Sequence, residues 1–307
     1  MRRITAIRAV AVPRAKPAVL SDRASAALAA ARCKPATRTQ IHFGGMMFTA
    51  NPFAALTGLL APAVMQTYVV VMVLLVIAGT LFDVVHKGSA KYFFANWRKS
   101  KTKGARQVDA GELAGIALKT GLVDVLASGE FCNARRRIAH LLTMYGFLIY
   151  VATTAIMVFF YPTLEKPTPT CLPQLWWLGG LMICLGGYWF WFFIRVDVAA
   201  EGGSPFRVMR ADLFILSLLS SVTLGLIWAW LQTSGSPAAK VLFGLYILAT
   251  TVLFGSIPWS KFAHMFFKPA AALEKRISNA NGSRNNLPAP ADQPERFGSA
   301  RKAPRHY

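Results

Sequence analysis

Five long stretches of this chain contain no Asp, Glu, Lys or Arg, and each is long enough to cross a lipid bilayer as a helix. The hydrocarbon core of a bilayer is about 30 Å thick, so a helix needs about 20 apolar residues to cross it. The apolar runs are continuous rather than alternating, which favours helices over strands. The sequence therefore predicts an all-α integral membrane protein, a bundle of five transmembrane helices. The stretches are Phe53–Phe82, Ile138–Leu164, Pro167–Ile194, Leu213–Ala239 and Val241–Ser260.

The ends of these stretches carry further signals. The first is most convincing from Val64 onward, after Pro62, and the fifth is expected to continue through Lys261 to about Phe267, because apolar residues resume there. Tryptophan prefers the headgroup region of a membrane. Seven of the 8 tryptophans lie near expected span ends, which supports the boundaries.

Composition excludes other classes of protein. Hydrophobic residues make up 54% of the 307 residues and charged residues only 15%, whereas soluble domains have about 25% charged residues. This argues against a disordered chain and against an ordinary soluble enzyme. The net charge is +21, but the basic residues lie outside the apolar stretches. That segregation indicates a membrane protein with cationic flanks rather than a nucleic-acid-binding protein.

Basic residues also predict the orientation. The segment 87–137 contains eleven Lys or Arg and four acidic residues, and nine basic residues follow from Lys261 onward, whereas the loop after the second span has only Lys166. Cytoplasmic loops are the ones enriched in Lys and Arg. We therefore expect the long loop and the C-terminus to be cytoplasmic and, with five spans, the N-terminus to be outside. The expected location is the bacterial inner membrane.

The N-terminal segment conflicts with that orientation. Residues 1–45 carry nine basic residues and one acid, and such a segment resists export. A transit peptide is one interpretation. The preferred one is that translation begins at Met46 or Met47. The predicted organisation is a basic segment 1–52 that is either untranslated or disordered, a first helix in 53–86, a cytoplasmic basic loop with amphipathic helices in 87–137, a four-helix membrane domain in 138–268 and a disordered basic tail in 269–307.

The long loop offers a surface for a partner. Its first part, 91–103, mixes aromatic residues with cations, which suits a helix on a membrane surface. Asp109 and Glu112 resemble a capping box, and apolar residues between 113 and 126 fit a short amphipathic helix. The apolar face of this helix lies on the membrane or receives a partner, unless the segment is only a solvated connector. We predict partner docking through Lys99, Lys101 and Lys103, because this cationic loop would attract an acidic surface.

Histidines are the remaining candidates for chemistry. No hydrolase, kinase or nucleotide-binding motif is present, and no two cysteines form a CxxC pair. His140 and His264 lie near the same predicted interface on different spans. Two facing imidazoles would bind one b-type haem, with Arg136 and Lys261 near its propionates. The alternative is that these histidines are solvated boundary residues and that the cations only set topology. His86 is the reserve ligand.

Three sequence segments resemble a known family. They are RRRIAHLLTMYGF at 135–147, RADLFIL at 210–216 and IPWSKFAHMFF at 257–267. They resemble membrane subunits of the quinone-interacting oxidoreductase of sulfate reducers, which are similar to the nitrate reductase gamma subunit and to heterodisulfide reductase membrane subunits. The resemblance covers roughly residues 130–270. The short chain with five spans looks most like the membrane anchor of dissimilatory adenylylsulfate reductase.

This resemblance implies a function in electron transfer. The chain would anchor a soluble flavin and iron–sulfur enzyme that converts sulfite and AMP to adenylylsulfate, and would pass its electrons to quinone. It would then be a non-catalytic or electron-transfer subunit rather than an enzyme itself. The relatives have a further His near the start of the fifth span, where this chain has none, so at most one haem is expected. The alternatives are a purely structural anchor without cofactor, the membrane subunit of another quinone-linked sulfur or heterodisulfide oxidoreductase, or a channel.

Overall fold

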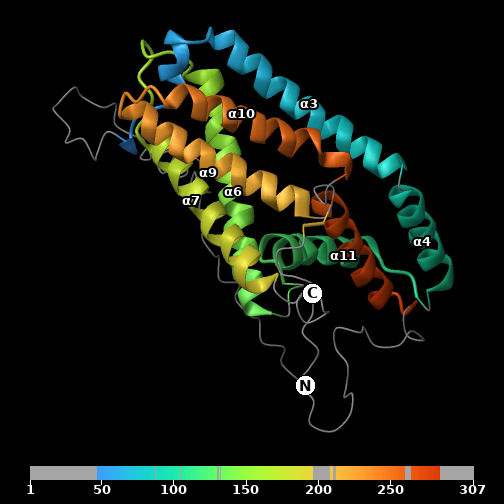
Figure 1. Ribbon diagram of the computed structural model, residues 1–307. Helices are drawn as coiled ribbons and strands as arrows, with labels where there is room; N and C mark the ends of the chain where they lie inside the picture. Colours follow the sequence, from blue (N-terminus) through green and yellow to red (C-terminus); the bar gives the residue numbers. More distant parts are fainter. Residues whose placement is uncertain are drawn as a thin grey trace, which may run out of the picture. The chain divides into compact units, whose positions relative to one another are not determined.

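The computed structural model describes residues 47–86, 88–104, 106–129, 131, 133–195, 208–209, 212–259 and 264–283. Within these ranges all regular structure is helical, as predicted (Figure 1). Four helices are long and apolar enough to cross a membrane; they are α3 (Pro62–His86), α6 (Ala134–Phe160), α7 (Cys171–Trp189) with its π-helical continuation η3 (Phe190–Ile194), and α9 (Leu213–Thr233). A fifth apolar helix, α10 (Ala239–Gly255), is shorter.

Shorter elements precede, connect and follow these helices. They are η1 (Ala54–Gly58), α4 (Ser89–Lys103), α5 (Ala110–Lys119), the π-helical η2 (Thr120–Leu126), η5 (Ile257–Trp259) and α11 (His264–Ala280). The predicted capping box is confirmed, because the Asp109 carboxylate accepts a hydrogen bond from the Glu112 amide at the start of α5. The first membrane helix begins at Pro62, where a fixed φ and a missing N–H are tolerated.

The end of the fifth stretch differs from the prediction. α10 ends at Gly255, a single 3₁₀ turn follows at Ile257–Trp259, and α11 begins at His264. Pro258 lies in that turn and cannot donate a backbone hydrogen bond, which interrupts the ladder. The predicted continuous helix through Lys261 to Phe267 is therefore wrong. Residues 269–280, assigned above to the disordered tail, form most of α11.

Contacts near the helix ends show which ends lie side by side. The β-carbon position of Gly186 in α7 lies 2.6 Å from the Ala139 carbonyl oxygen in α6, and that of Gly79 in α3 lies 3.1 Å from Ile257 after α10. Arg195, after η3, pairs with Asp212, before α9. The starts of α6 and α9 thus lie with the ends of α7, and the end of α3 lies with that of α10. We call the end with Arg195 and the start of α6 the basic end.

α6 and α7 approach each other closely because glycines line their contact. A β-carbon on Gly146 would lie 2.7 Å from the Gly179 carbonyl oxygen, and one on Gly179 would lie 2.8 Å from the Tyr150 amide nitrogen. Small residues at a membrane helix contact allow backbones to pack directly. These two helices form the most extensive pairing in the described bundle.

Tryptophans stabilise the interior rather than only the membrane boundary. Trp176 is 0% exposed and stacks on Tyr150, with ring centres 4.9 Å apart. Trp228 is 1% exposed and stacks on Tyr246 at 5.6 Å. Neighbouring helices enclose both rings, so they pack in the core; their predicted depth near the span ends stays a prediction. Sequence position alone could not separate these cases, because an indole suits both a core and a membrane interface.

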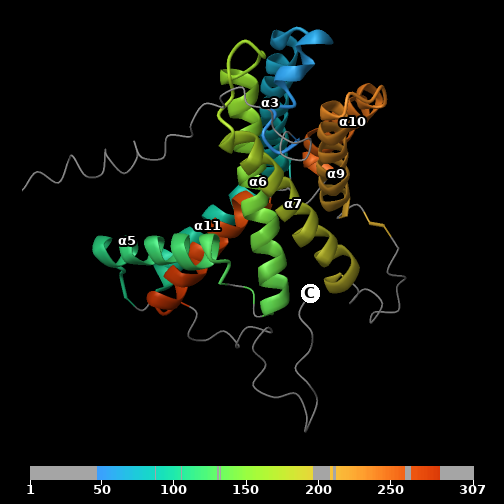
Figure 2. The same ribbon diagram turned by 90° about the vertical axis from the view of Figure 1, so that its left-hand side faces the viewer.

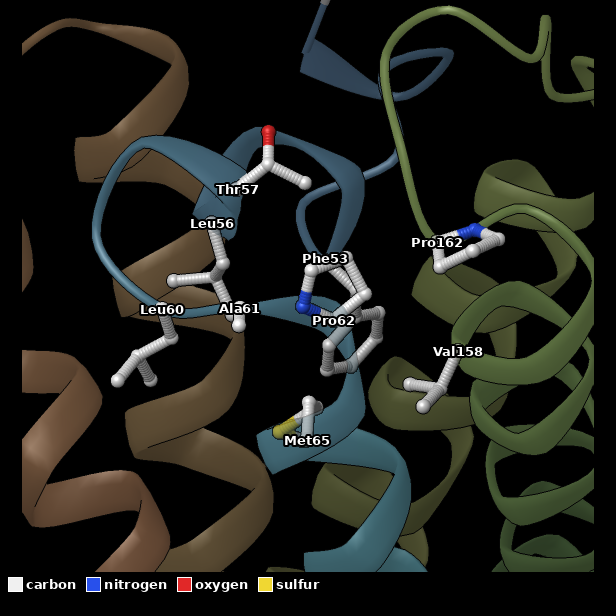
Figure 3. Close-up of a pocket in the computed structure, with 9 residues that line it drawn as sticks. All are labelled: Phe53, Leu56, Thr57, Leu60, Ala61, Pro62, Met65, Val158 and Pro162. Atoms are coloured by element: carbon white, nitrogen blue, oxygen red, sulfur yellow. The ribbon is translucent and has the colours of Figure 1, made fainter.

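The end opposite the basic end is closed by residues 47–60. The Asn51 amide donates to the Tyr161 carbonyl and to Thr168 Oγ1, both at 3.0 Å, while Gln232 donates to the Pro52 carbonyl at 2.9 Å. A small apolar cavity lies below this cap, between η1, the start of α3 and the end of α6 (Figure 3). Its volume is about 10 Å³, room for about one water molecule.

Candidate functional site

His140 lies in the second turn of α6 at the basic end. Its side chain is half-buried, and its ring centre is 4.9 Å from that of Phe131. Arg136, one turn earlier, places its guanidinium 6.0 Å from the centre of the Phe190 ring on η3. The helix start is fixed by Asn133, whose side-chain oxygen accepts from the Arg135 and Arg136 amides. α6 therefore presents a histidine and a cation beside the end of α7.

The other predicted site residues are only partly described. His264 is the first residue of α11, but its side chain and the whole of Lys261 lie outside the described part of the structure. Lys99, Lys101 and Lys103 follow one another along α4, and their side chains are likewise outside it. The reserve ligand His86 is exposed and stacks on Phe82 at 5.2 Å, one turn back on α3. The structure therefore brings no pair of these histidines into contact within its described side chains.

An ion pair that the sequence analysis did not predict lies at the same end. Arg195 Nε donates to Asp212 Oδ1 at 3.1 Å, and its Nη2 contacts Asp212 Oδ2. The side chains are 7% and 11% exposed. Asp212 also accepts from the Met209 amide at 2.9 Å, and the Arg195 guanidinium lies 3.9 Å from the centre of the Trp191 ring. The pair therefore ties η3 to the start of α9 in a low-dielectric setting.

Asp83 is a second buried carboxylate that sequence reasoning missed. It is 2% exposed and lies one turn beyond Gly79, which contacts Ile257. The charge-free stretch predicted from the sequence ends one residue before it, at Phe82, and no role was assigned to Asp83. α3 runs to His86, the end of the predicted first-helix segment 53–86, and Asp83 lies within packed helix. The signal available from sequence was one acid between apolar residues in LFDVVH.

Hydroxyl groups form an interior polar tract between the spans. The Tyr150 hydroxyl lies 3.5 Å from that of Tyr246, and Ser221 and Thr250 hydroxyls lie 2.7 Å apart. Thr250 also donates to the Tyr246 carbonyl at 2.8 Å. All four residues are buried, and they belong to α6, α9 and α10. The tract joins these helices by hydrogen bonds that hydrocarbon cannot replace.

Two charge pairs position the helices outside the spans. Arg276 of α11 makes bidentate contacts of 2.5 and 2.8 Å with Asp124 of η2. Arg106 binds Glu112 in the same way and donates to the Ala280 carbonyl at 2.8 Å. The hydrogen bond from Arg276 lowers the pKa of Asp124, and that from Arg106 lowers the pKa of Glu112. Together these contacts clamp α11 against α5 and η2.

The Asp124–Arg276 pair predicts an acid-sensitive contact. The folded-state pKa of Asp124 lies below its ordinary value of 3.8, so the pair stabilises the fold above that pH. This contribution is lost as the pH falls through the lowered folded value. We expect hydrogen exchange in 264–280 to accelerate across that interval in protein held in nanodiscs. Asp124→Asn should remove this pH dependence and give fast exchange at neutral pH as well. An unchanged exchange profile in the variant would contradict the clamp.

Fold and site together are those of an all-helical protein with four helices long and apolar enough to cross a membrane, and with a basic end. The family model described as CitB, Citrate utilization protein B, matches residues 12–285. The chain belongs to this family. Citrate utilization protein B of Escherichia coli is 28% identical over 199 residues, which is 61% of this chain and 51% of that protein. The chain thus spans about half the length of this curated relative. No solved structure matches.

This family membership corrects the functional interpretation. The resemblance to the membrane anchor of adenylylsulfate reductase is wrong, because the family match covers most of the chain and names a different process. The predicted soluble flavin and iron–sulfur partners are not supported, and neither is sulfur oxidation coupled to quinone and haem. The alternatives of a structural anchor and of another sulfur or heterodisulfide oxidoreductase subunit are also unsupported. Lys99, Lys101 and Lys103 were predicted to dock that soluble enzyme. Because the enzyme is not supported as a partner, this docking prediction has no identified partner.

Ligation of a haem by His140 and His264 is a separate prediction that neither the fold nor the family match tests. It has a direct spectral measurement. If the pair binds one b-type haem, purified protein from haem-sufficient cells will show a Soret band, and His140→Ala will remove it. His86→Ala removes the reserve ligand and should keep the band, because the assigned pair is His140 and His264. A wild-type protein without a Soret band would show that the assignment is wrong.

Proposed function

We propose that this chain is a membrane-embedded component of a system for the use of citrate or a related tricarboxylate. The observation that carries the proposal is the family match over residues 12–285, which includes all the membrane helices. The identity to the Escherichia coli protein supports the same process. Because the chain spans about half of that relative, the proposal concerns the membrane component and leaves other functions of the relative aside.

Charge at the basic end fits this process. Citrate carries several carboxylates, and a surface lined by one sign of charge raises the local concentration of the opposite ion. Arg135 and Arg136 begin α6 at this end, and the first of them is exposed. The chain as a whole carries a net charge of +21. The basic end is therefore the surface that we propose to act on an anionic substrate or an acidic partner.

Growth on a defined carbon source tests the proposed function. A strain lacking this gene should fail to grow on citrate or a related tricarboxylate while growing normally on glucose. Uptake of radiolabelled citrate then separates two roles. Lost uptake would place the protein in entry, and retained uptake with lost growth would place it in a later step. Equal growth of deletion and parent strains on every tricarboxylate offered would contradict the proposal.

Complementation with matched variants tests the role of the basic end. Arg135→Gln combined with Arg136→Gln removes two charges there, whereas Lys166→Gln removes one from the loop between α6 and α7 at the opposite end. We expect the first variant to complement growth on citrate poorly and the second to complement it fully, at equal amounts in the membrane. Equal complementation by both would show that the basic end is not the working surface.

We also propose that α10 is a fifth span and that the basic end is cytoplasmic in a bacterial inner membrane. Seventeen residues of α-helix extend about 26 Å, close to the thickness of the hydrocarbon core. α10 packs extensively along α9, and the Lys and Arg bias of 87–137 favours a cytoplasmic loop. Alkaline phosphatase fused after residue 166 should be active, and the same enzyme fused after residue 283 should be inactive. Activity of both fusions would contradict the topology.

A further inference from the structure

The segment made of α5 and η2 has an inverted distribution of polarity. Its less exposed stripe is Glu112, Ile116, Thr120 and Asp124, which recur every fourth residue. Glu112 and Asp124 on this stripe bind Arg106 and Arg276. With the half-buried Val125 beside the stripe, three of the five side chains that turn away from solvent are therefore polar. A water-exposed helix would bury its apolar side instead.

The opposite face of this segment is apolar and exposed. Its large side chains recur every fourth residue and are 47 to 64% exposed; they are Leu118, Leu122 and Leu126. The charged side chain among them is Lys119. Water is a poor environment for three neighbouring leucine side chains, because keeping each of them hydrated is unfavourable. The face therefore requires an apolar environment outside the described helices.

Contacts with α6 place this face at the level of the membrane boundary. Tyr145 donates from its hydroxyl to the Leu126 carbonyl at 2.8 Å, and Arg137 Nε donates to the Ala127 carbonyl at 2.7 Å. Tyr145 is exposed on the same side of α6 as Ile138, two turns earlier. Figure 2 shows α5 running across the direction of α6 rather than along it. The end of η2 thus lies on the outer, lipid-facing side of a membrane span.

Helix lengths agree with that depth. α6 has 27 residues, about 40 Å of helix, which exceeds the 30 Å hydrocarbon core by about 10 Å. Tyr145 lies about 16 Å along α6 from Ala134, and tyrosine prefers the boundary between headgroups and acyl chains. Leu126, bound to its hydroxyl, lies near the same boundary. The apolar face is therefore continuous with the apolar, lipid-facing surface of α6.

We propose that α5 and η2 form an in-plane membrane helix, with Leu118, Leu122 and Leu126 in the acyl region of the leaflet at the basic end. Lys119 would lie at the headgroups, where an anionic lipid attracts it. The clamp of Arg276 on Asp124 holds α11 against the polar stripe. A bilayer accounts for all of these features: the inverted polarity, the continuity with α6 and the flanking cation.

Photo-crosslinking tests the position of this helix in the intact protein. The photoreactive residue p-benzoylphenylalanine is placed at Leu118 or Leu122, and the protein is reconstituted in nanodiscs of phosphatidylcholine and phosphatidylglycerol. Mass spectrometry then measures lipid adducts. We expect yields similar to those at Leu148, a 52% exposed position on the span α6. Asn279, exposed on α11, is the water-facing control and should give at least about tenfold less lipid adduct.

Three outcomes would overturn the proposal. Lipid adducts at Leu148 but none at Leu118 or Leu122 would show that the face lies in water. Adducts to a second polypeptide at Leu118 in native membranes, in place of lipid, would show a protein partner. Equal lipid adducts at Leu118 and Asn279 would show random contact. None of these results depends on whether the protein acts in citrate use, so the two proposals can fail separately.

Discussion

Replacing Asp212 by alanine is expected to lower the free energy of unfolding by about 3–5 kcal/mol, because the buried Arg195 then loses the carboxylate that balances its charge. The pair is 7% and 11% exposed, and its Nε to Oδ1 distance is 3.1 Å. The same carboxylate accepts the Met209 amide at 2.9 Å, so the variant also removes a hydrogen bond at the start of α9. Titration with sodium dodecyl sulfate, followed by circular dichroism, measures the loss.

A double variant separates charge from packing. Arg195→Met combined with Asp212→Leu removes both charges and keeps side-chain volume beside Trp191. Buried ion pairs can often be replaced by apolar residues with little loss. The double variant should therefore be clearly more stable than Asp212→Ala alone. Equal loss in the two variants would show that the Coulombic partner of Arg195 is not what stabilises this end of the bundle.

The class of fold could be predicted from the sequence because each span has its own local signal. A charge-free run longer than about 18 residues has few alternatives to a membrane helix. The four long helices coincide with four of the predicted stretches. The N-cap at Asp109 also has a local sequence signal, because an acidic residue three positions before Glu112 is enough to predict it. The break after Gly255 was missed because Pro258 stands inside an uninterrupted apolar run.

The buried polar groups could not be predicted in the same way, since they depend on contacts between distant segments. Arg195 and Asp212 are separated by a loop, and each alone resembles an ordinary charge at a span end. Tyr150 and Tyr246 meet only after α6 and α10 have packed around α9. The sequence shows which residues carry hydroxyl groups. Which hydroxyl groups pair depends on how the helices are aligned along one another. This alignment depends in turn on close contacts at glycines, and the sequence of one apolar stretch alone does not show where those contacts form.

The functional interpretation failed for a different reason. It rested on three short segments within residues 130–270, and the most specific was a histidine among basic and aromatic residues near Lys261. Such a combination also arises from general membrane physics, because cations and aromatic residues gather at span ends. The family match extends over residues 12–285 and therefore constrains far more of the chain. Length of agreement, rather than one motif, decides between these families.

Gly146→Ala is expected to destabilise the bundle by about 1–3 kcal/mol, because the added methyl group overpacks the contact between α6 and α7. Its β-carbon would lie 2.7 Å from the Gly179 carbonyl oxygen and 2.9 Å from the Ile183 amide nitrogen. Both neighbours are backbone atoms, so no side-chain rotation can relieve the clash and the helices must separate. Leucine at this position should prevent the close packing altogether. Thermal unfolding in detergent micelles measures the change.

The matched control for this prediction is Gly244→Ala in α10. Gly244 is exposed, and a β-carbon there would meet no heavy atom within 4 Å. The same substitution should therefore leave stability unchanged or raise it by up to about 1 kcal/mol, since alanine is the better helix former. The two variants differ in packing but not in chemistry, so the difference between their midpoints isolates the contact between α6 and α7. If Gly146→Ala and Gly244→Ala shift the unfolding midpoint equally, the glycine contact does not set the distance between these helices.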